Sequence, residues 1–209
     1  MFYKKITKYI TGVSYEFDKI SLERKQLLES FAEFISNKNE KDEEVNLIFI
    51  CTHNSRRSQF AQVWAKTSAE YYGIKNINSF SGGTEATAFN LRAVNALGKV
   101  GFEINKSDEN ENPIYSIQYS EKLEPLNCFS KIYNNSFNPQ NNFTAIMTCS
   151  DADENCPIVF GADERFPIRY EDPKKFDDTD LEEIKYDERC REIAREMLFT
   201  FSLVNQKKS

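Results

Sequence analysis

The sequence predicts an α/β fold in which helices cover a central parallel sheet. Short apolar segments of strand length alternate along the chain with helical patterns, which is typical of parallel sheets. Residues 45–50, VNLIFI, are rich in branched side chains, as a buried parallel strand should be. A loop follows directly, and a helix is expected from about Arg57, so this part of the chain forms a strand–loop–helix unit.

The later elements continue the alternation. Strands are expected at residues 77–81, 143–147 and 166–168, and helices at residues 90–100 and 180–205. Both predicted helices carry their apolar side chains on a single face, which is the pattern of a helix that packs on a sheet.

Two segments lie outside this pattern. Residues 1–44 predict a helical extension, because apolar side chains recur there at helical spacing and a charged connector follows. Residues 106–142 contain polar loops and two short segments, 114–119 and 128–133, that can pair as a β-ribbon. We therefore expect an insertion at about residues 106–142 of the α/β fold.

The composition excludes several classes of protein. The 209 residues include 27 Lys and Arg against 33 Asp and Glu, a net charge of −6 without a basic stretch, which argues against a nucleic-acid partner. No uncharged apolar run approaches the roughly 20 residues of a membrane helix, and the N-terminus lacks the apolar region of a signal peptide. We therefore expect a cytoplasmic protein, whose five cysteines are core residues, metal ligands or redox groups rather than structural disulfides.

The loop CTHNSRRS, residues 51–58, carries the strongest chemical signal. Ligands bind at the carboxyl ends of parallel strands, and successive N–H groups at a helix N-terminus form an anion nest. The helix dipole favours the thiolate of Cys51, Ser58 can donate to it, and Arg57 can hold two oxygens of a tetrahedral oxyanion. This combination suits a thiolate that attacks the centre of a bound oxyanion. The alternative is a buried free cysteine beside a surface arginine.

Longer stretches around this loop resemble a known family. IFICTHNSRRSQFAQVWA resembles the active-site loop of the low-molecular-weight protein tyrosine phosphatase superfamily, and FSGGTEATAFNLRAVNALGKVGFEI resembles its second strand and helix. CSDADENCP, residues 149–157, resembles the redox segment of the thioredoxin-coupled arsenate reductases, a branch of that superfamily. Glu171-Asp172-Pro173 matches the Asp-Pro that carries the general acid. The four matches occur in the order of the family.

The resemblance implies a three-layer α/β sandwich around a central parallel sheet. It leaves the N-terminal extension and the insertion uncovered. We therefore expect a helical extension, residues 1–44, followed by a phosphatase- or arsenate reductase-like catalytic domain, residues 45–209, with the insertion at about residues 106–142.

The resemblance also implies roles for single residues. Cys51 would be the nucleophile, Arg57 would clamp the oxyanion, and Asp172 would protonate the leaving oxygen, a step worth about 10²–10⁴ in rate. The oxyanion-binding residues run along the loop and are Thr52, His53, Asn54, Ser55, Arg56, Arg57 and Ser58. Ser81 matches the serine that supports the loop. The alternative for Asp172 is an exposed loop acid.

Cys149 and Cys156 distinguish the branches of the superfamily, because a phosphatase needs only Cys51. The resemblance implies that Cys149 attacks the arseno-cysteine, which releases arsenite and leaves a Cys51–Cys149 disulfide. Cys156 then forms a disulfide with Cys149, and thioredoxin reduces it. The alternatives are two inert cysteines or a metal site, although the lone His53 and the Cys-x6-Cys spacing fit no common zinc pattern. The chemistry needs no cofactor.

Three positions depart from the family pattern. His53 stands where the family usually has glycine. Either its side chain crowds the oxyanion or the loop needs no positive φ there, and a protonated His53 could help to hold a doubly negative ligand. Arg56 replaces a cysteine and adds positive charge beside the loop. Gln62 replaces a residue that is often acidic in the reductases, which puts a potassium site like theirs in doubt.

The sequence therefore leaves three functions open. The leading hypothesis is a thioredoxin-coupled arsenate reductase whose substrate is a small oxyanion. The second is a phosphomonoesterase that acts on phosphotyrosine or a small phosphate ester and needs Cys51 but not Cys149. The third is a non-catalytic oxyanion-binding protein in which His53 has disabled the loop.

Overall fold

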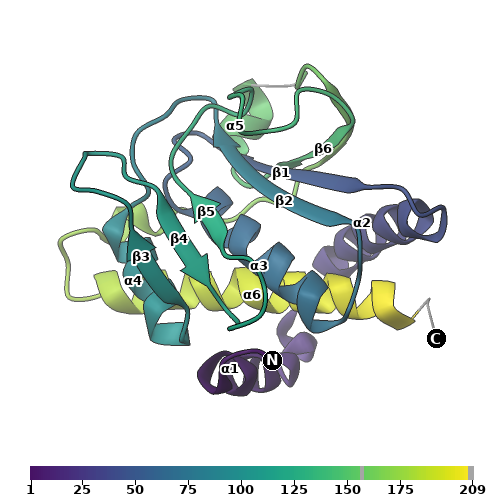
Figure 1. The fold of residues 1–209 in the computed structure, drawn as a ribbon, viewed down its shortest axis with the longest axis horizontal. Coiled ribbons are helices and arrows are strands. Elements are labelled where there is room, and N and C mark those ends of the chain that lie inside the picture. The colour runs from purple at the N-terminus through teal and green to yellow at the C-terminus, as the bar shows by residue number, and fades with distance from the viewer. Residues whose placement is uncertain (156–157, 207–209) are drawn as a thin grey trace.

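The computed structural model describes residues 1–155 and 158–206. Its centre is a four-stranded sheet in the order β2–β1–β6–β7, with every neighbouring pair parallel (Figure 1). The strands are β1 Val45–Cys51, β2 Ile77–Gly83, β6 Phe143–Met147 and β7 Ala162–Phe166. The predicted α/β fold with a central parallel sheet is confirmed.

Strand β1 separates two hydrophobic cores. Leu47 and Phe49 point into the larger core, whereas Ile48 and Ile50 point into a smaller core on the other face of the sheet. All four side chains are fully buried, and each burial of this kind stabilises the fold by about 1.5–3 kcal/mol. Because both faces of the sheet are covered, β1 is apolar along almost its whole length.

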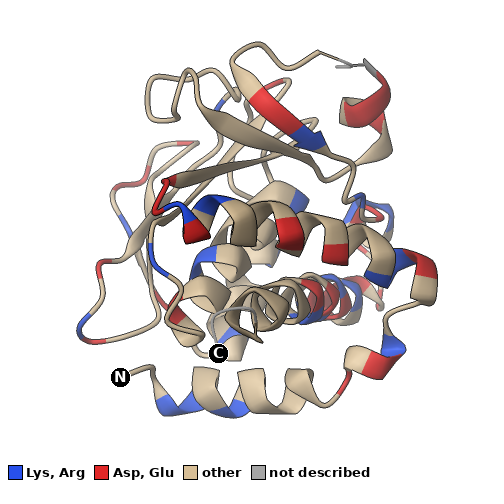
Figure 2. Ribbon diagram, turned by 90° about the vertical axis from the view of Figure 1, so that its right-hand side faces the viewer, with Lys and Arg blue, Asp and Glu red and all other residues tan. Residues whose placement is uncertain are grey.

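Five helices surround the larger core. They are α1 Lys4–Ser14, α2 Leu22–Glu40, α3 Arg57–Tyr71, α4 Leu91–Val100 and α6 Glu182–Gln206. Figure 2 shows these helices in tiers beneath the sheet, with α1 farthest from it. Most of α3 is buried, because it packs between the strands β1 and β2 on one side and α6 on the other.

The smaller core lies under a short helix, α5 Ser150–Asn155, on the opposite face of the sheet from α3 and α6 (Figure 1). Ala152 of this helix and Val159 of the following loop are buried against the residues at the ends of β1 and β6. The segment that resembles a redox segment therefore begins directly at the carboxyl edge of the sheet.

The insertion differs from the predicted ribbon. It forms a three-stranded antiparallel sheet with β4 Tyr115–Gln118 between β3 Glu103–Lys106 and β5 Leu126–Cys128. The strand expected at residues 128–133 is wrong, since β5 ends at Cys128. The residues after it turn to the end of β2, where Gly83 N–H donates to Lys131 O and Tyr133 N–H donates to Gly83 O.

The last strand also differs from its prediction. The expected strand at residues 166–168 is instead β7, Ala162–Phe166, which ends where that strand was expected to begin. Its sequence, ADERF, is charged and half exposed because β7 is the edge strand of the sheet. An apolar pattern does not mark such a strand.

The two helices of the N-terminal extension share the core of the sheet. Ile6 and Ile10 of α1 are fully buried in the larger core. The chain end before α1 joins the insertion, because Phe2 forms a bridge with Ser120. The extension therefore packs on the same core as the residues that follow it.

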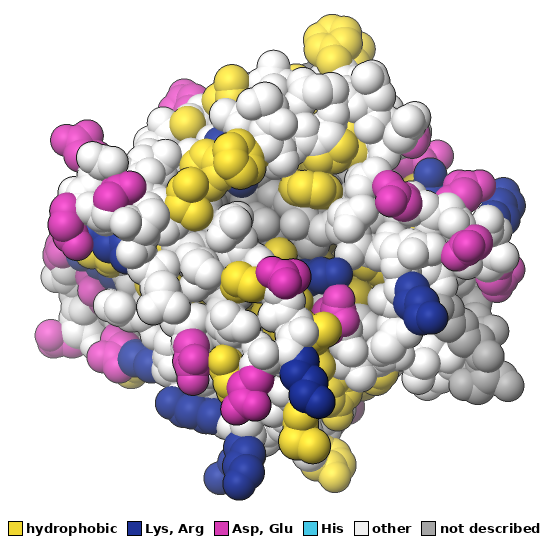
Figure 3. Space-filling model, in the orientation of Figure 1, with side chains coloured by type: hydrophobic (Ala, Val, Ile, Leu, Met, Phe, Trp, Pro, Cys, Tyr) yellow, Lys and Arg dark blue, Asp and Glu magenta, His cyan; other side chains and the backbone are white. Residues whose placement is uncertain are grey.

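Acidic and basic side chains are interspersed on the face of the molecule seen in Figure 3. Within residues 1–155 and 158–206, none of the helices combines the length and the apolar character of a membrane-spanning segment.

Candidate active site

The loop of residues 51–58 connects the carboxyl end of β1 to the start of α3. The first backbone N–H groups of α3 have no partners within the helix, so they are available to an anion. Gly83 of β2 lets the loop approach closely. A Cβ atom at this position would lie 2.6 Å from Thr52 O and 2.9 Å from Asn54 N, which is too close for any side chain.

A chain of hydrogen bonds leads to the sulfur of Cys51. Lys131 N–H donates to Asn54 Oδ1 at 2.9 Å, and Asn54 Nδ2 donates to Ser58 Oγ at 2.8 Å. Ser58 Oγ lies 3.1 Å from Cys51 Sγ. Since Ser58 already accepts from Asn54, its own hydrogen is available for donation to the sulfur.

One guanidinium nitrogen of Arg57 has no hydrogen-bond partner among the described residues. Its Nη1 donates to Tyr170 O at 3.1 Å, and its Nη2 donates to Asp172 Oδ2 at 2.7 Å. Its Nε is buried and has no hydrogen-bond partner among the described residues. A buried donor without a partner costs about 1–3 kcal/mol, so Nε marks a place where an oxyanion oxygen would be bound.

Asp172 lies beside the loop although it comes 114 positions after Ser58 in the chain. It is the residue before the 3₁₀-helix η2, Pro173–Phe176, and its Oδ1 accepts from Lys174 N–H at 3.0 Å. Its Oδ2 faces Arg57 and is 3.8 Å from Arg56 Nη1. The fold thus places Asp172, the expected general acid, beside Arg57, the expected oxyanion ligand.

Cys149 follows β6, the neighbour of β1, and is fully buried. Its Sγ lies 3.6 Å from Thr52 Oγ1 and accepts from Ala152 N–H at 3.3 Å. Thr52 Oγ1 donates in turn to Asp151 Oδ2 at 2.6 Å. The sulfur of Cys149 is therefore next to the residue that follows Cys51. Cys156 lies outside the described residues.

The remaining cysteines are in the core. Burial raises the pKa of Cys128 and of Cys190 to about 12. Cys190 accepts from Trp64 Nε1 at 3.3 Å on the inner face of α6. Among the described residues, neither sulfur is hydrogen-bonded to the loop. Within the described part of the chain, no three His, Cys, Asp or Glu side chains are grouped as metal ligands.

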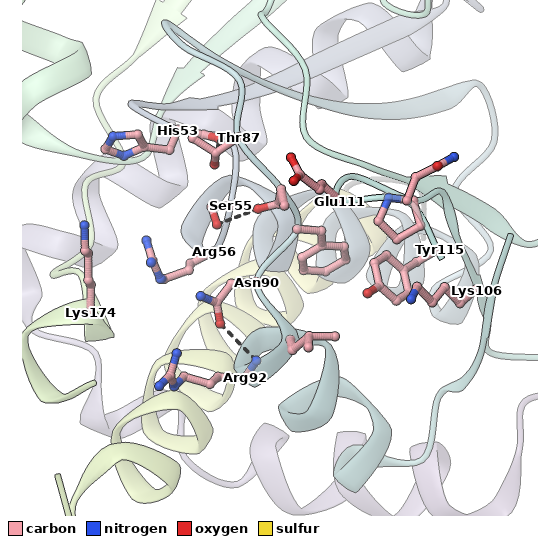
Figure 4. A pocket seen from close by; sticks show the side chains of 15 residues that line it. His53, Ser55, Arg56, Thr87, Asn90, Arg92, Lys106, Glu111, Tyr115 and Lys174 are labelled. Atoms are coloured by element: carbon pink, nitrogen blue, oxygen red, sulfur yellow. Dashed lines mark hydrogen bonds between the residues drawn. The ribbon is translucent and has the colours of Figure 1, made fainter. Parts of the chain in front are cut away.

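A cleft of about 570 Å³ opens beside the loop and is bordered by His53, Ser55 and Arg56. Figure 4 shows His53, Arg56 and Lys174 around one end of this cleft. The backbone of the loop does not need glycine at residue 53, because the positive φ of 47° occurs at Asn54. The His53 side chain is partly exposed at the border of the cleft, and its Nε2 is 3.6 Å from Glu85 Oε2.

The sequence did not predict the residues whose side chains donate hydrogen bonds to the backbone carbonyl groups of the loop. Ser130 Oγ donates to His53 O at 2.9 Å, and Gln59 Nε2 donates to Asn54 O at 2.9 Å. The predicted support, Ser81, is fully buried, but its Oγ has no hydrogen-bond partner among the described residues. Ser130 belongs to an irregular segment of the insertion, where no sequence pattern marks it.

The chain is similar to curated arsenate reductases. It is 30% identical to the arsenate reductase of Bacillus subtilis strain 168 over 156 residues, which cover 75% of this chain and 94% of the relative. The chain belongs to the arsenate reductase family, a branch of the low-molecular-weight protein tyrosine phosphatase superfamily. The arsenate reductase of Bacillus licheniformis is 29% identical over the same share of both chains.

A solved structure supports the fold of this family member. The crystal structure of a YwlE mutant from Bacillus subtilis matches with a TM-score of 0.51 and 20% identity, over 79% of this chain and 100% of that one. No protein-family model matches the chain. As a member of a family of enzymes, the protein is an enzyme of the reductase or the phosphatase kind.

Proposed function

We propose that the protein reduces arsenate to arsenite with Cys51, Cys149 and Cys156. One observation carries this proposal: the buried sulfur of Cys149 lies 3.6 Å from the hydroxyl of Thr52, the residue after the nucleophile. A phosphatase needs one cysteine, whereas a reductase needs a second one beside it to supply electrons. The identity of about 30% to curated arsenate reductases supports the same choice.

The first step joins arsenate to Cys51. The backbone N–H groups at the start of α3 and the unpaired Nε of Arg57 hold the oxyanion. The Cys51 thiolate attacks arsenic, and a sulfur–arsenic bond forms. The hydroxyl oxygen of hydrogen arsenate takes a proton from the Asp172 carboxyl and leaves as water as its bond to arsenic breaks.

The second step transfers two electrons to arsenic. The thiolate of Cys149 attacks the sulfur of Cys51, so that a Cys51–Cys149 disulfide forms. The sulfur–arsenic bond breaks, and its electron pair stays on arsenic, which leaves as arsenite. The hydrogen bond from Ala152 N–H stabilises the attacking sulfur.

The third step restores the nucleophile. Cys156 attacks the sulfur of Cys149, which forms a Cys149–Cys156 disulfide and frees the Cys51 thiolate. A protein dithiol, for which we propose thioredoxin, then reduces that disulfide. Such a relay requires reduced thiols at rest, so the proposal includes a cytoplasmic location.

Arsenate-dependent NADPH oxidation in the presence of thioredoxin and thioredoxin reductase tests this function. The wild type should turn over, and Cys149→Ser should lose turnover while it still binds arsenate. Cys190→Ala is the matched control, because Cys190 is a buried thiol whose hydrogen-bond partner is Trp64 and not the loop, and it should keep the rate. Full activity of Cys149→Ser, or no turnover of the wild type with active coupling proteins, would contradict the proposal.

The cleft favours a second candidate function, the hydrolysis of phosphate monoesters. Its volume of about 570 Å³ leaves room for an organic group beside a bound oxyanion. This activity would need Cys51 and Asp172 but not Cys149, because water hydrolyses the phosphocysteine. Multiple turnover of an aryl phosphate by Cys149→Ser is the expected result, and its absence for several aryl phosphates would exclude this candidate.

A further inference from the structure

Arg56 replaces the cysteine of the family pattern, and each nitrogen of its guanidinium faces an acceptor. Its Nε donates to Tyr186 Oη at 2.9 Å. Its Nη1 lies 3.8 Å from Asp172 Oδ2, and its Nη2 lies 3.9 Å from Asp177 Oδ2. The side chain is 10% exposed, so these contacts are shielded from solvent.

Tyr186 of α6 fixes the orientation of this guanidinium. Its hydroxyl accepts from Arg56 and donates to Asp177 Oδ1 at 2.8 Å. Burial raises the pKa of Tyr186, so the phenol keeps the proton that it donates. Asp177 is also 3.7 Å from Arg92 Nη1 of α4, which connects the site to a second helix.

Asp172 therefore has two arginine neighbours on the same oxygen. In the structure, Arg57 Nη2 makes the short contact of 2.7 Å, and Arg56 is the more distant partner. A bidentate grip of Arg57 on an oxyanion uses its Nε and Nη2, so the oxyanion competes with Asp172 for Nη2. Arg56 keeps its position in that event, because Tyr186 and Asp177 hold it independently of Arg57.

We propose that Arg56, oriented by Tyr186 and Asp177, is a positioning residue that keeps the carboxyl of Asp172 over the loop while Arg57 binds the oxyanion. This inference rests on the proposed role of Asp172 as general acid, but not on the cysteine relay. In this arrangement the Arg56 nitrogens face Tyr186, Asp172 and Asp177, so we do not expect Arg56 to be a second oxyanion ligand.

The dependence of rate on the leaving group tests this role. The first-turnover burst of phenol from phenyl phosphate depends strongly on a general acid, whereas release of the better leaving group from 4-nitrophenyl phosphate depends on it less. We expect Arg56→Gln to slow the phenyl phosphate burst about 10- to 100-fold, a part of the full general-acid effect, with little change in KM. The loss for 4-nitrophenyl phosphate should be clearly smaller.

Further variants separate positioning from a structural role. Tyr186→Phe should show the same leaving-group pattern to a smaller degree, and Arg56→Lys should recover part of the phenyl phosphate rate. The change Arg56→Gln should have almost no further effect in Asp172→Asn, because both act on one group. Tyr119→Phe is the matched control, since Tyr119 and Tyr186 are each 1% exposed and Tyr119 lies in the insertion.

Two results would overturn the inference. One is an equal loss for both esters together with a raised KM, which would make Arg56 an oxyanion ligand or a structural residue. The other is an Asp172→Asn variant that releases phenol from phenyl phosphate as fast as the wild type, because Asp172 would then not be the general acid that Arg56 positions. The burst needs Cys51 but not Cys149, so a normal burst without arsenate turnover would reject the reductase proposal alone.

Discussion

Cys51 and Cys149 are buried as deeply as Cys128 and Cys190, at 0–3% exposure, but the two pairs lie in different places. The first pair follows the carboxyl ends of β1 and β6, where the oxyanion loop, Ser58 and Thr52 surround the sulfur atoms. The second pair packs inside the core, where burial raises the thiol pKa. Burial alone therefore does not distinguish the two cysteines that we propose to react from the other two, whereas their position in the parallel sheet does.

The largest expected effect comes from replacing the nucleophile. Cys51→Ser should abolish arsenate turnover, because a serine hydroxyl at this site is far less nucleophilic than a thiolate. Cys190→Ala should keep the turnover, since Cys190 contacts Trp64 and not the loop. The coupled NADPH assay measures the turnover of both variants. A loss of activity in both at equal thermal stability would contradict the different roles assigned to Cys51 and Cys190.

Asp172→Asn should lower kcat for arsenate about 10²- to 10⁴-fold, which is the usual contribution of a general acid. The amide keeps the size of the side chain and its contact with Lys174 N–H, so KM should change little. Steady-state kinetics at several arsenate concentrations separates the two constants. A raised KM at unchanged kcat would assign Asp172 to binding.

Thiol labelling compares the two pairs of cysteines in a single sample. At pH 8 a thiol whose pKa is about 12 is thiolate in only about one molecule in 10⁴, so native Cys128 and Cys190 should resist iodoacetamide. Cys51 should react at least about 100-fold faster, since the thiolate is the reactive form and Ser58 donates to this sulfur. Peptide mapping by mass spectrometry gives the order, and early labelling of Cys190 would contradict the account.

The smallest expected effect is on stability and involves Lys131, whose backbone supports Asn54. Burial lowers the pKa of the Lys131 amine from 10.5 to about 8, so the unfolded chain binds more protons between these pH values. Stability due to this group therefore rises with pH across that window. Lys131→Met should therefore raise the free energy of unfolding by up to a few kcal/mol at pH 7 and by little at pH 10.

Urea unfolding at pH 7 and pH 10 checks this sign. A gain of the same size at both pH values would show that the cost of Lys131 is not electrostatic. Lys174→Met is the control, because Lys174 is an exposed lysine and its replacement should change stability equally at the two pH values.

Local patterns explain how much of this molecule can be predicted from sequence. The strand at residue 45, the loop and the start of the helix at Arg57 are marked by neighbouring residues, and the structure has all three. Asp172 could be placed only by resemblance, because its partner Arg57 is more than 100 residues away in the chain.

The support of the loop could not be predicted in this way. Ser130, Gln59 and Tyr186 act through contacts that exist only after distant segments have packed together. The position of the edge strand β7 could not be predicted either, because its sequence is charged and lacks the apolar pattern that marks a buried strand. Local sequence thus predicts the reacting groups better than the groups that hold them.

The most direct test of the relay is to trap its disulfide. Cys156→Ser, treated with arsenate under anaerobic conditions, should release one arsenite per chain and stop with a disulfide between Cys51 and Cys149. Peptide mapping without reduction identifies that bond, and arsenite is counted in the same sample. Arsenite release with free thiols at Cys51 and Cys149, or a disulfide that involves Cys128 or Cys190, would contradict the account.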